Sequence, residues 1–159
     1  MYEILILALI GIDQLTKWLV RTSLSSSRSI EIIGGFFNLT YVENRGAAFG
    51  LLQNMKVFFV LVALIVAIVG LVYIHRSKSR DGARTKKDLR IARINRLAVS
   101  SIIGGAIGNL IDRLWLGYVV DFFDFRFIWS YVFNFADILV VVGTVVFCIS
   151  MFMLGEDVD

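Results

Sequence analysis

Two carboxylates that border apolar segments are the side chains of this sequence best suited to chemistry. Asp121 ends a run of apolar residues, and Asp137 lies within the first turns of the last apolar segment. Ionisation of a carboxylate in or beside hydrocarbon costs free energy, so such residues usually serve a function. Two carboxylates brought together share one proton, which is the state of an acid–base pair that hydrolyses peptide bonds. Asp121 and Asp137 can form such a pair if the fold brings them together.

Other catalytic chemistries lack the residues that they need. A serine or cysteine nucleophile is activated by a neighbouring histidine, and His75, the only histidine, is expected at the far end of the second apolar segment. Cys148, the only cysteine, lies within the last apolar segment, where a cysteine is usually a small packing residue. Zinc needs His or Cys ligands, and no carboxylates have the spacing of a calcium or magnesium loop. The sequence therefore predicts no metal and no cofactor.

The composition places these residues in an integral membrane protein. The chain has 159 residues, of which 58% are hydrophobic and 18% charged, and its mean hydropathy is +0.79. Soluble domains are less apolar, and about a quarter of their residues are charged. This length favours a single domain over residues 1–159.

Four segments are long and apolar enough to cross a bilayer, which takes roughly 20 residues of helix. They cover about residues 2–20, 57–74, 97–116 and 131–154. The connection of about residues 30–50 is rich in β-branched and aromatic residues on either side of Gly34 and Gly35, which is typical of a hairpin. The predicted fold is membrane all-α, with four transmembrane helices and a small extracytoplasmic β-hairpin or sheet.

The distribution of basic residues predicts the orientation. The connection of residues 76–96 holds nine Lys or Arg against two Asp, and such loops stay on the cytoplasmic side. Both termini then lie in the cytoplasm, and Asp121 and Asp137 lie near the outer face. We expect this basic loop to contact anionic lipid and not nucleic acid.

Polar residues on one face of the third segment can line a pocket. Asn109, Asp112 and Arg113 are spaced i, i+3 and i+4, so they share one face of a helix. Arg113 can either position backbone and carboxylate groups or contact substrate. Asp112, beside Arg113, is expected to form a structural pair at the membrane interface.

The first and last segments can add to the same pocket. Asn134 precedes Asp137 by three residues, and Asp13 precedes Lys17 by four. Asp13 and Lys17 can neutralise each other or line the pocket. We expect these faces to converge in a four-helix bundle, with one polar pocket open to the outside.

Two further groups have structural explanations. Ser100, Gly104 and Gly108 form a stripe of small residues, which favours close helix packing. Asp124 falls in a short outer connection, where we expect it to be solvated.

Five phrases of the sequence, in this order along the chain, resemble those of the lipoprotein signal peptidases, the type II signal peptidases of bacterial inner membranes. The phrases cover residues 13–17, 44–50, 104–113, 117–122 and 133–137. They extend from the first predicted helix to the fourth, so the resemblance covers most of the chain.

The resemblance implies an aspartic intramembrane peptidase that cuts diacylglyceryl-modified prolipoproteins just before the lipidated cysteine. Asp121 and Asp137 match the catalytic pair of the family. The positions that match substrate-binding or pocket residues are Asn44, Gly46, Asn109, Arg113, Asn134, Asp13 and Lys17. The resemblance also implies a multi-pass monomer of the inner (cytoplasmic) membrane, which needs no cofactor and contacts prolipoprotein substrates and membrane lipid.

Two other functions could use the same residues. A small transporter or channel subunit could pass protons or cations along Asp13, Lys17 and Asp137, but the polar residues gather near one face and no inverted repeat is visible. A non-catalytic assembly factor could bind lipidated peptides in the same pocket. Release of the signal peptide from a lipidated precursor in micelles distinguishes the three functions.

Overall fold

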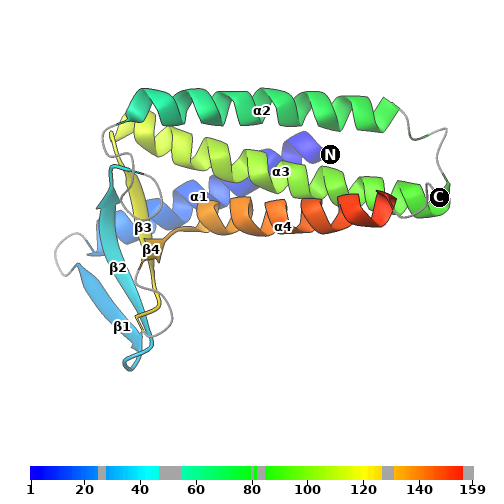
Figure 1. Cartoon of the computed structure of the whole chain (residues 1–159). Coiled ribbons are helices and arrows are strands. Elements are labelled where there is room, and N and C mark those ends of the chain that lie inside the picture. Colours follow the sequence, from blue (N-terminus) through cyan, green and yellow to red (C-terminus); the bar gives the residue numbers. More distant parts are fainter. Residues whose placement is uncertain (25–27, 47–54, 80, 82–84, 127–130, 156–159) are drawn as a thin grey trace.

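Four long helices lie side by side, and a small antiparallel sheet covers one end of them (Figure 1). The structure is a computed structural model, and it describes residues 1–24, 28–46, 55–79, 81, 85–126 and 131–155. The helices are α1 (Tyr2–Leu24), α2 (Lys56–Ser79), α3 (Lys86–Trp115) and α4 (Phe135–Gly155). The strands are β1 (Ser29–Ile33), β2 (Phe37–Asn44), β3 (Val119–Asp124) and β4 (Val132–Phe133). The start of α1 and the end of α4 lie away from the sheet.

Three of the described helices, α2, α3 and α4, are long and apolar enough to cross a membrane. The prediction of a membrane protein built on apolar helices is therefore confirmed for three of the four expected spans. α1 has a similar length, but it carries Glu3, Asp13, Lys17 and Arg21, so its composition alone does not mark it as a span.

Apolar side chains cover the outer faces of α2 and α4. Leu61 and Ile65 of α2 and Val145 and Ile149 of α4 are exposed on the surface. Hydrocarbon accommodates such a surface, whereas a soluble monomer rarely exposes an extended apolar patch to water. Cys148 was expected to pack inside, but it is exposed on α4. A helix that is apolar on all sides gives no sequence signal for which face is buried.

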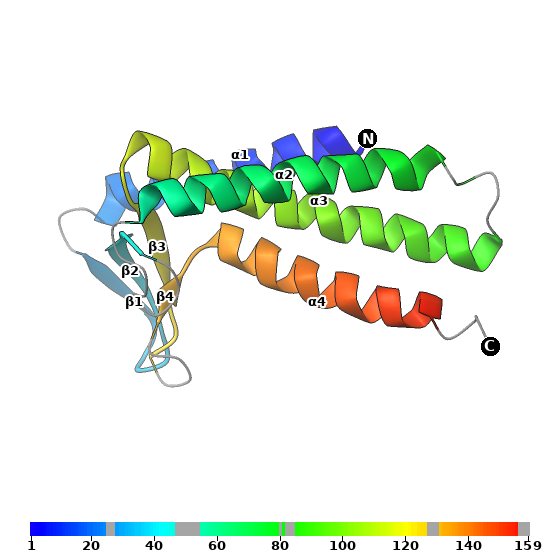
Figure 2. The same cartoon turned by 45° about the horizontal axis from the view of Figure 1, so that its top comes forward.

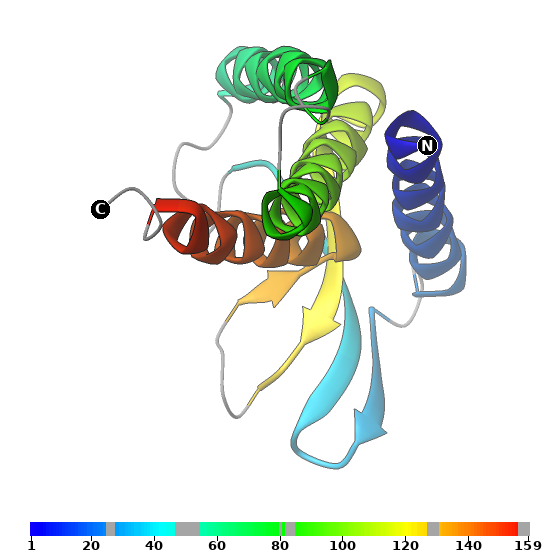
Figure 3. The ribbon, with the colours of Figure 1, turned by 90° about the vertical axis from the view of Figure 1, so that its right-hand side faces the viewer.

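α3 is the central helix and contacts the other three (Figure 3). Small residues permit this approach. A Cβ atom on Gly104 would lie 3.0 Å from Cβ of Leu9, and one on Gly108 would meet the carboxylate of Asp13. The predicted packing role of the small-residue stripe is thus confirmed for α1 against α3.

The sheet has the strand order β1-β2-β3-β4, with antiparallel neighbours. The predicted hairpin is confirmed as β1 and β2, and Gly35 in its turn has a positive φ of 67°. β3 then pairs with β2, which places Val42 opposite Asp121 and Asn44 opposite Val119. Asp121 therefore lies on a strand of the sheet and not in an irregular connection.

Asp124 is not solvated as predicted. Its side chain is 13% exposed, and its carboxylate accepts a hydrogen bond from Oγ1 of Thr40 at 2.7 Å and lies 3.2 Å from Nε of Arg126. The reason is the pairing of β2 with β3, which brings Thr40 beside it and which no local pattern predicts.

Helix α3 begins at Lys86, well before the predicted start at residue 97, and α2 continues to Ser79. Most of the described part of the predicted 76–96 loop is therefore helical. Lys and Arg are good helix formers, and Thr85 with Asp88 forms a capping box at the start of α3. A search for apolar segments misses such a charged extension.

Arg96 of α3 contacts α1 and the connection before α3, at the end of the bundle away from the sheet. The guanidinium is 2% exposed and forms two hydrogen bonds with the carboxylate of Asp81, at 2.8 and 3.0 Å. It also donates to the hydroxyl of Tyr2 at 3.1 Å and lies over the ring of that residue. The start of α1 and the connection before α3 are thereby held to α3.

We expect the substitution Gly105→Ala to lower the free energy of unfolding by about 1–3 kcal/mol, because overpacking forces the backbone to shift. A Cβ atom at Gly105 would collide with the carbonyl oxygen of Ala136 in α4. Gly11→Ala in α1 is the matched control, since nothing lies within 4 Å of the added atom. Thermal unfolding of both variants in detergent checks the prediction, and equal stability of the two variants would contradict it.

Candidate active site

The structure brings Asp121 and Asp137 together through a single residue, Asn134. The side-chain amide of Asn134 donates to Oδ1 of Asp121 at 2.6 Å, and its backbone N–H donates to Oδ2 of Asp137 at 3.1 Å. Asn134 is 0% exposed. The two carboxylates therefore share one buried hydrogen-bonding neighbour.

Local helix chemistry explains the spacing of Asn134 and Asp137. Asn134 immediately precedes α4, and its Oδ1 accepts the backbone N–H of Asp137 at 3.0 Å, while Asp137 accepts the N–H of Asn134. This reciprocal pair is a capping box, in which the residue before a helix and its third residue satisfy each other's N–H groups. Asn134 and Asp137 thus cap the start of α4, and the same hydrogen bonds fix the orientation of one oxygen of Asp137.

Asp121 is almost fully buried on β3, with 2% exposure. Its Oδ2 accepts a hydrogen bond at 2.8 Å from the amide of Asn44 on β2. Burial raises the pKa of Asp121 to about 7, and the negative charge of Asp137 adds to the rise. The hydrogen bonds from Asn44 and Asn134 favour the ionised form and oppose this shift in pKa.

Asp137 is half-buried in the first turn of α4. Its Oδ1 accepts a hydrogen bond at 2.8 Å from the amide of Asn109 on α3. The Asn109 oxygen in turn accepts from the ammonium group of Lys17 at 2.8 Å and from Asn134 at 3.2 Å. A chain of hydrogen bonds therefore leads from α1 through α3 to the carboxylate on α4.

Lys17 lies in a buried ion cluster with Asp13 and Asp112, behind Asn109. Its Nζ is 2.9 Å from Asp13 and 3.3 Å from Asp112, and none of the three side chains is more than 3% exposed. The structure thus shows the neutralising pair that the Asp13–Lys17 spacing suggested. Neither Asp13 nor Lys17 is among the residues that line the cavity in front of Asn109.

The two carboxylates of the ion cluster also hold the main chain beside the candidate catalytic residues. Asp112 accepts the backbone N–H of Val120, which precedes Asp121, at 3.0 Å. Asp13 accepts the backbone N–H of Ala136, which precedes Asp137, at 3.0 Å. The second bond satisfies an N–H group that the first turn of a helix leaves without an intrahelical partner.

Gln14 is a member of this cluster that the sequence reasoning missed. Its amide lies within hydrogen-bond distance of Asp13 (3.2 Å), Asp112 (3.1 Å) and the backbone oxygen of Gly108 (3.0 Å). The available signal was its position next to Asp13 within an apolar segment. Asp112 was expected to form a structural pair beside Arg113, but its partners are Lys17, Gln14 and the backbone N–H of Val120.

Arg113 connects α3 to the residues that follow β2. It donates to the backbone oxygen of Gly46 at 3.2 Å, and its guanidinium lies 4.6 Å from the ring centre of Phe59 on α2. The N–H of Gly46 donates to Oδ1 of Asn44 at 2.9 Å. Arg113 therefore supports the backbone next to Asn44, which itself contacts Asp121.

A cavity of about 1000 Å³ lies between α2, α3, α4 and the sheet. α2 and α4 flank α3 in Figure 2. The polar residues that line the cavity include Asn44, Asn109, Arg113, Asp121 and Asp137. The apolar lining residues include Val62, Ala63, Val66, Ile102, Ala106 and Val140. The cavity can therefore accept a ligand with a polar part at the sheet and an apolar part along the helices.

Ligands for a metal ion are few in the described part of the chain. Among the described residues, no group of three or more His, Cys, Asp or Glu side chains could hold one. Asp13 and Asp112 are already engaged by Lys17. His75 lies on the exposed surface of α2, 3.7 Å from Glu3.

Comparisons with known proteins match almost the whole chain. The family described as signal peptidase (SPase) II matches residues 5–153. A lipoprotein signal peptidase of Clostridioides difficile is 51% identical over 149 residues, which cover 94% of this chain and 93% of the relative. That of Fusobacterium nucleatum is 44% identical over 149 residues, with coverages of 94% and 84%.

A solved structure has the same fold. It is described as that of a bacterial membrane enzyme, is 26% identical in sequence, and covers 99% of this chain and 91% of its own, with a TM-score of 0.82. The sequence match extends from the first helix to the last and includes every residue of the site described above. The chain therefore belongs to the signal peptidase II family.

Proposed function

We propose that this member of the signal peptidase II family is an aspartic endopeptidase with Asp121 and Asp137 as its catalytic pair. Its substrates are diacylglyceryl-modified prolipoproteins, and it cuts before the lipidated cysteine. The relatives named lipoprotein signal peptidase support the removal of signal peptides from prolipoproteins. The bridge from Asn134 to both carboxylates is the observation that carries the aspartic assignment.

The pair holds one proton in the active state. The ionised carboxylate takes a proton from a water molecule, whose oxygen attacks the scissile carbonyl carbon. The protonated carboxyl transfers its proton to the carbonyl oxygen, which becomes a hydroxyl of the tetrahedral intermediate. The carboxyl that took the proton from water passes it to the amide nitrogen, and the C–N bond breaks. One hydroxyl of the intermediate returns its proton to the other carboxylate as the product carboxyl forms, so the pair again holds one proton. The proton belongs to the pair and not to one residue.

The residues around the pair position the substrate. Asn109 and Arg113 line the cavity beside Asp137, and Asn44 and Gly46 line it beside Asp121. Their remaining polar groups can hold an extended peptide across the two carboxylates. The apolar walls of the cavity on α2 and α4 suit the signal helix and the acyl chains, so the substrate enters sideways from the bilayer.

Asn134, Asp13 and Lys17 act from behind the cavity wall. Asn134 aligns the two carboxylates, and the ammonium group of Lys17 orients Asn109. In this proposal these three residues hold the geometry of the pair and need not touch substrate.

We also propose that α1 is the fourth transmembrane helix of a monomer in the bacterial inner membrane. Asp13 and Lys17, at 0% and 3% exposure, face the bundle interior. Leu7, Leu15 and Trp18 are exposed on the outer face of α1, where lipid would lie. With four spans, both termini lie at the end of the bundle that carries the basic residues. Basic residues favour the cytoplasmic side, so the sheet lies on the outer side of the membrane.

We expect Asp121→Asn and Asp137→Asn each to lower the rate of precursor cleavage by roughly 10³-fold or more, because an amide cannot exchange the proton. Release of the signal peptide from a diacylglyceryl-modified precursor in micelles is the measurement. Asp124→Asn, on the same strand as Asp121 but outside the cavity, is the matched control and should cleave normally. Cleavage by either catalytic variant at the rate of the wild type would remove the pair from the mechanism.

The rate of cleavage should fall as pH rises above about 7, the pKa of Asp121. Above this pH Asp121 loses its proton, so it cannot give one to the scissile carbonyl oxygen. Asn44→Ala removes a hydrogen bond that favours the ionised form, and it should move the alkaline limb of kcat/KM to higher pH. If the alkaline limb stays in place or moves to lower pH in this variant, the limb does not report the titration of Asp121.

We expect EDTA to leave the rate of cleavage unchanged, since the proposed chemistry uses only carboxylates and water. The assay with purified protein and lipidated precursor checks this at a chelator concentration well above that of any trace metal. Loss of activity that a divalent cation restores would be inconsistent with a catalytic pair of this kind.

A further inference from the structure

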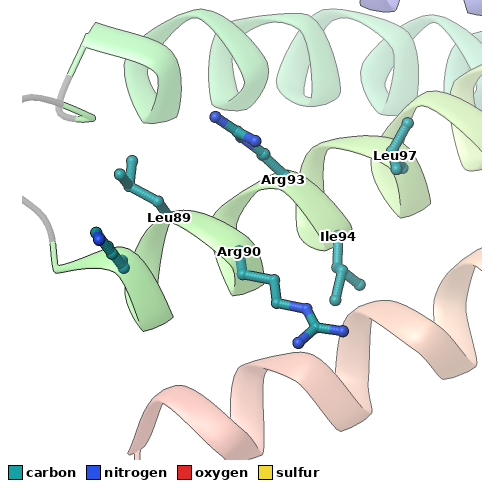
Figure 4. A pocket seen from close by; sticks show the side chains of 6 residues that line it. Leu89, Arg90, Arg93, Ile94 and Leu97 are labelled. Atoms are coloured by element: carbon teal, nitrogen blue, oxygen red, sulfur yellow. The ribbon is translucent and has the colours of Figure 1, made fainter.

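A second hollow lies on α3 at the end away from the sheet (Figure 4). Its volume is about 410 Å³, and its lining residues are Lys86, Leu89, Arg90, Arg93, Ile94 and Leu97. We call these residues the basic hollow. None of them lines the cavity that contains Asp121 and Asp137. Figure 4 shows Arg90 directed toward α4 and Arg93 directed toward α2.

The three cations of the basic hollow carry no counter-charge from the described residues. Lys86, Arg90 and Arg93 are exposed, and none has an ion pair or hydrogen bond among the described parts of the chain. The nearest acidic residues in the sequence are engaged elsewhere: Asp88 contacts Thr85 in the capping box, and Asp81 binds Arg96. An anion is therefore the complementary ligand.

The depth of the basic hollow follows from the length of α3. Its 30 residues span roughly 45 Å at the helical rise, whereas the hydrocarbon core is about 30 Å thick. α3 is therefore longer than the hydrocarbon core is thick. Its polar end is the one that begins at Lys86, so the first turns of α3 extend into the headgroup layer. The same face continues into Ile94 and Leu97, which are 37% and 45% exposed.

We propose that the basic hollow binds one anionic phospholipid, with the phosphate at its basic side chains and an acyl chain along Ile94 and Leu97. Arginine donates two parallel hydrogen bonds to phosphate oxygens, which makes it well suited to this group. The exposed apolar side chains beside the basic ones suit an acyl chain, which a soluble anion lacks. Headgroups lie at both faces of a bilayer, so the site does not depend on the orientation of the protein.

The experiment is a titration of the full-length protein in detergent with phosphatidylglycerol or phosphatidylcholine of the same chain length. Native mass spectrometry measures the apparent Kd of each lipid. We expect the wild type to prefer phosphatidylglycerol. The double variant Arg90→Gln with Arg93→Gln should bind phosphatidylglycerol about thirtyfold more weakly. This factor corresponds to a loss of about 1 kcal/mol of binding free energy for each basic residue removed. Unchanged affinity of this double variant would overturn the proposal.

The matched control is Arg76→Gln with Lys78→Gln. These residues lie in the last turn of α2, at the same end of the helix bundle but outside the basic hollow, and both are exposed. The control removes the same charge, so it should leave the affinity for phosphatidylglycerol unchanged. An equal loss in both double variants would mean general attraction to a basic surface and would overturn a specific site.

Two further arms test other occupants. Inorganic phosphate in large excess should not displace the lipid, and displacement would identify a site for a free anion instead. The chain's own residues 156–159 include Glu156, Asp157 and Asp159 and follow α4. A variant that ends at residue 155 should bind the lipid as the full chain does. About tenfold tighter binding would show that this acidic segment occupies the site in the full chain, which would overturn the lipid as its occupant. Cleavage is not the readout, so the result leaves the roles of Asp121 and Asp137 untouched.

Discussion

The position of the proposed catalytic pair depends on one buried cation, the ammonium group of Lys17. It lies within 3.3 Å of both Asp13 and Asp112, and all three side chains are withdrawn from solvent. Loss of one member of such a cluster leaves an uncompensated buried charge, which typically costs about 3–5 kcal/mol. Both carboxylates also accept backbone N–H groups, from Ala136 and Val120. The pairing of these charges therefore also determines where the chain before each aspartate can lie.

The helices and the sheet make different contributions to the site. The helices supply the apolar walls, Asn109 and the carboxylate on α4, whereas the sheet supplies Asp121 and the amide of Asn44. Two amides, from Asn134 and Asn44, compensate part of the cost of burying Asp121 without neutralising it. A cation in their place would lower the pKa of this carboxyl and remove its proton near neutral pH. The neutral amides of Asn134 and Asn44 therefore hold the Asp121 carboxyl in place and still allow it to carry a proton.

Local spacing in the sequence predicted much of this arrangement. Residues three or four apart on a helix predicted that Asn109 lies with Arg113 and Asn134 with Asp137. In the structure Asn134 precedes α4, and its link to Asp137 is a capping box. Spacing could not predict that Asp121 lies on a strand, because β3 pairs with β2, which is distant in sequence. It also could not show that Asp112 anchors the backbone of β3, since that contact depends on how the chain turns after α3.

Anchoring through main-chain N–H groups restricts which residues can occupy two positions. Any side chain of suitable size at 120 or 136 would preserve these hydrogen bonds, because the donor is the peptide group. Proline is the exception, since it has no N–H to give. The first turn of a helix usually tolerates proline, but here the N–H at position 136 already serves Asp13. The chain contains no proline at all, and at these two sites its absence has a direct chemical reason.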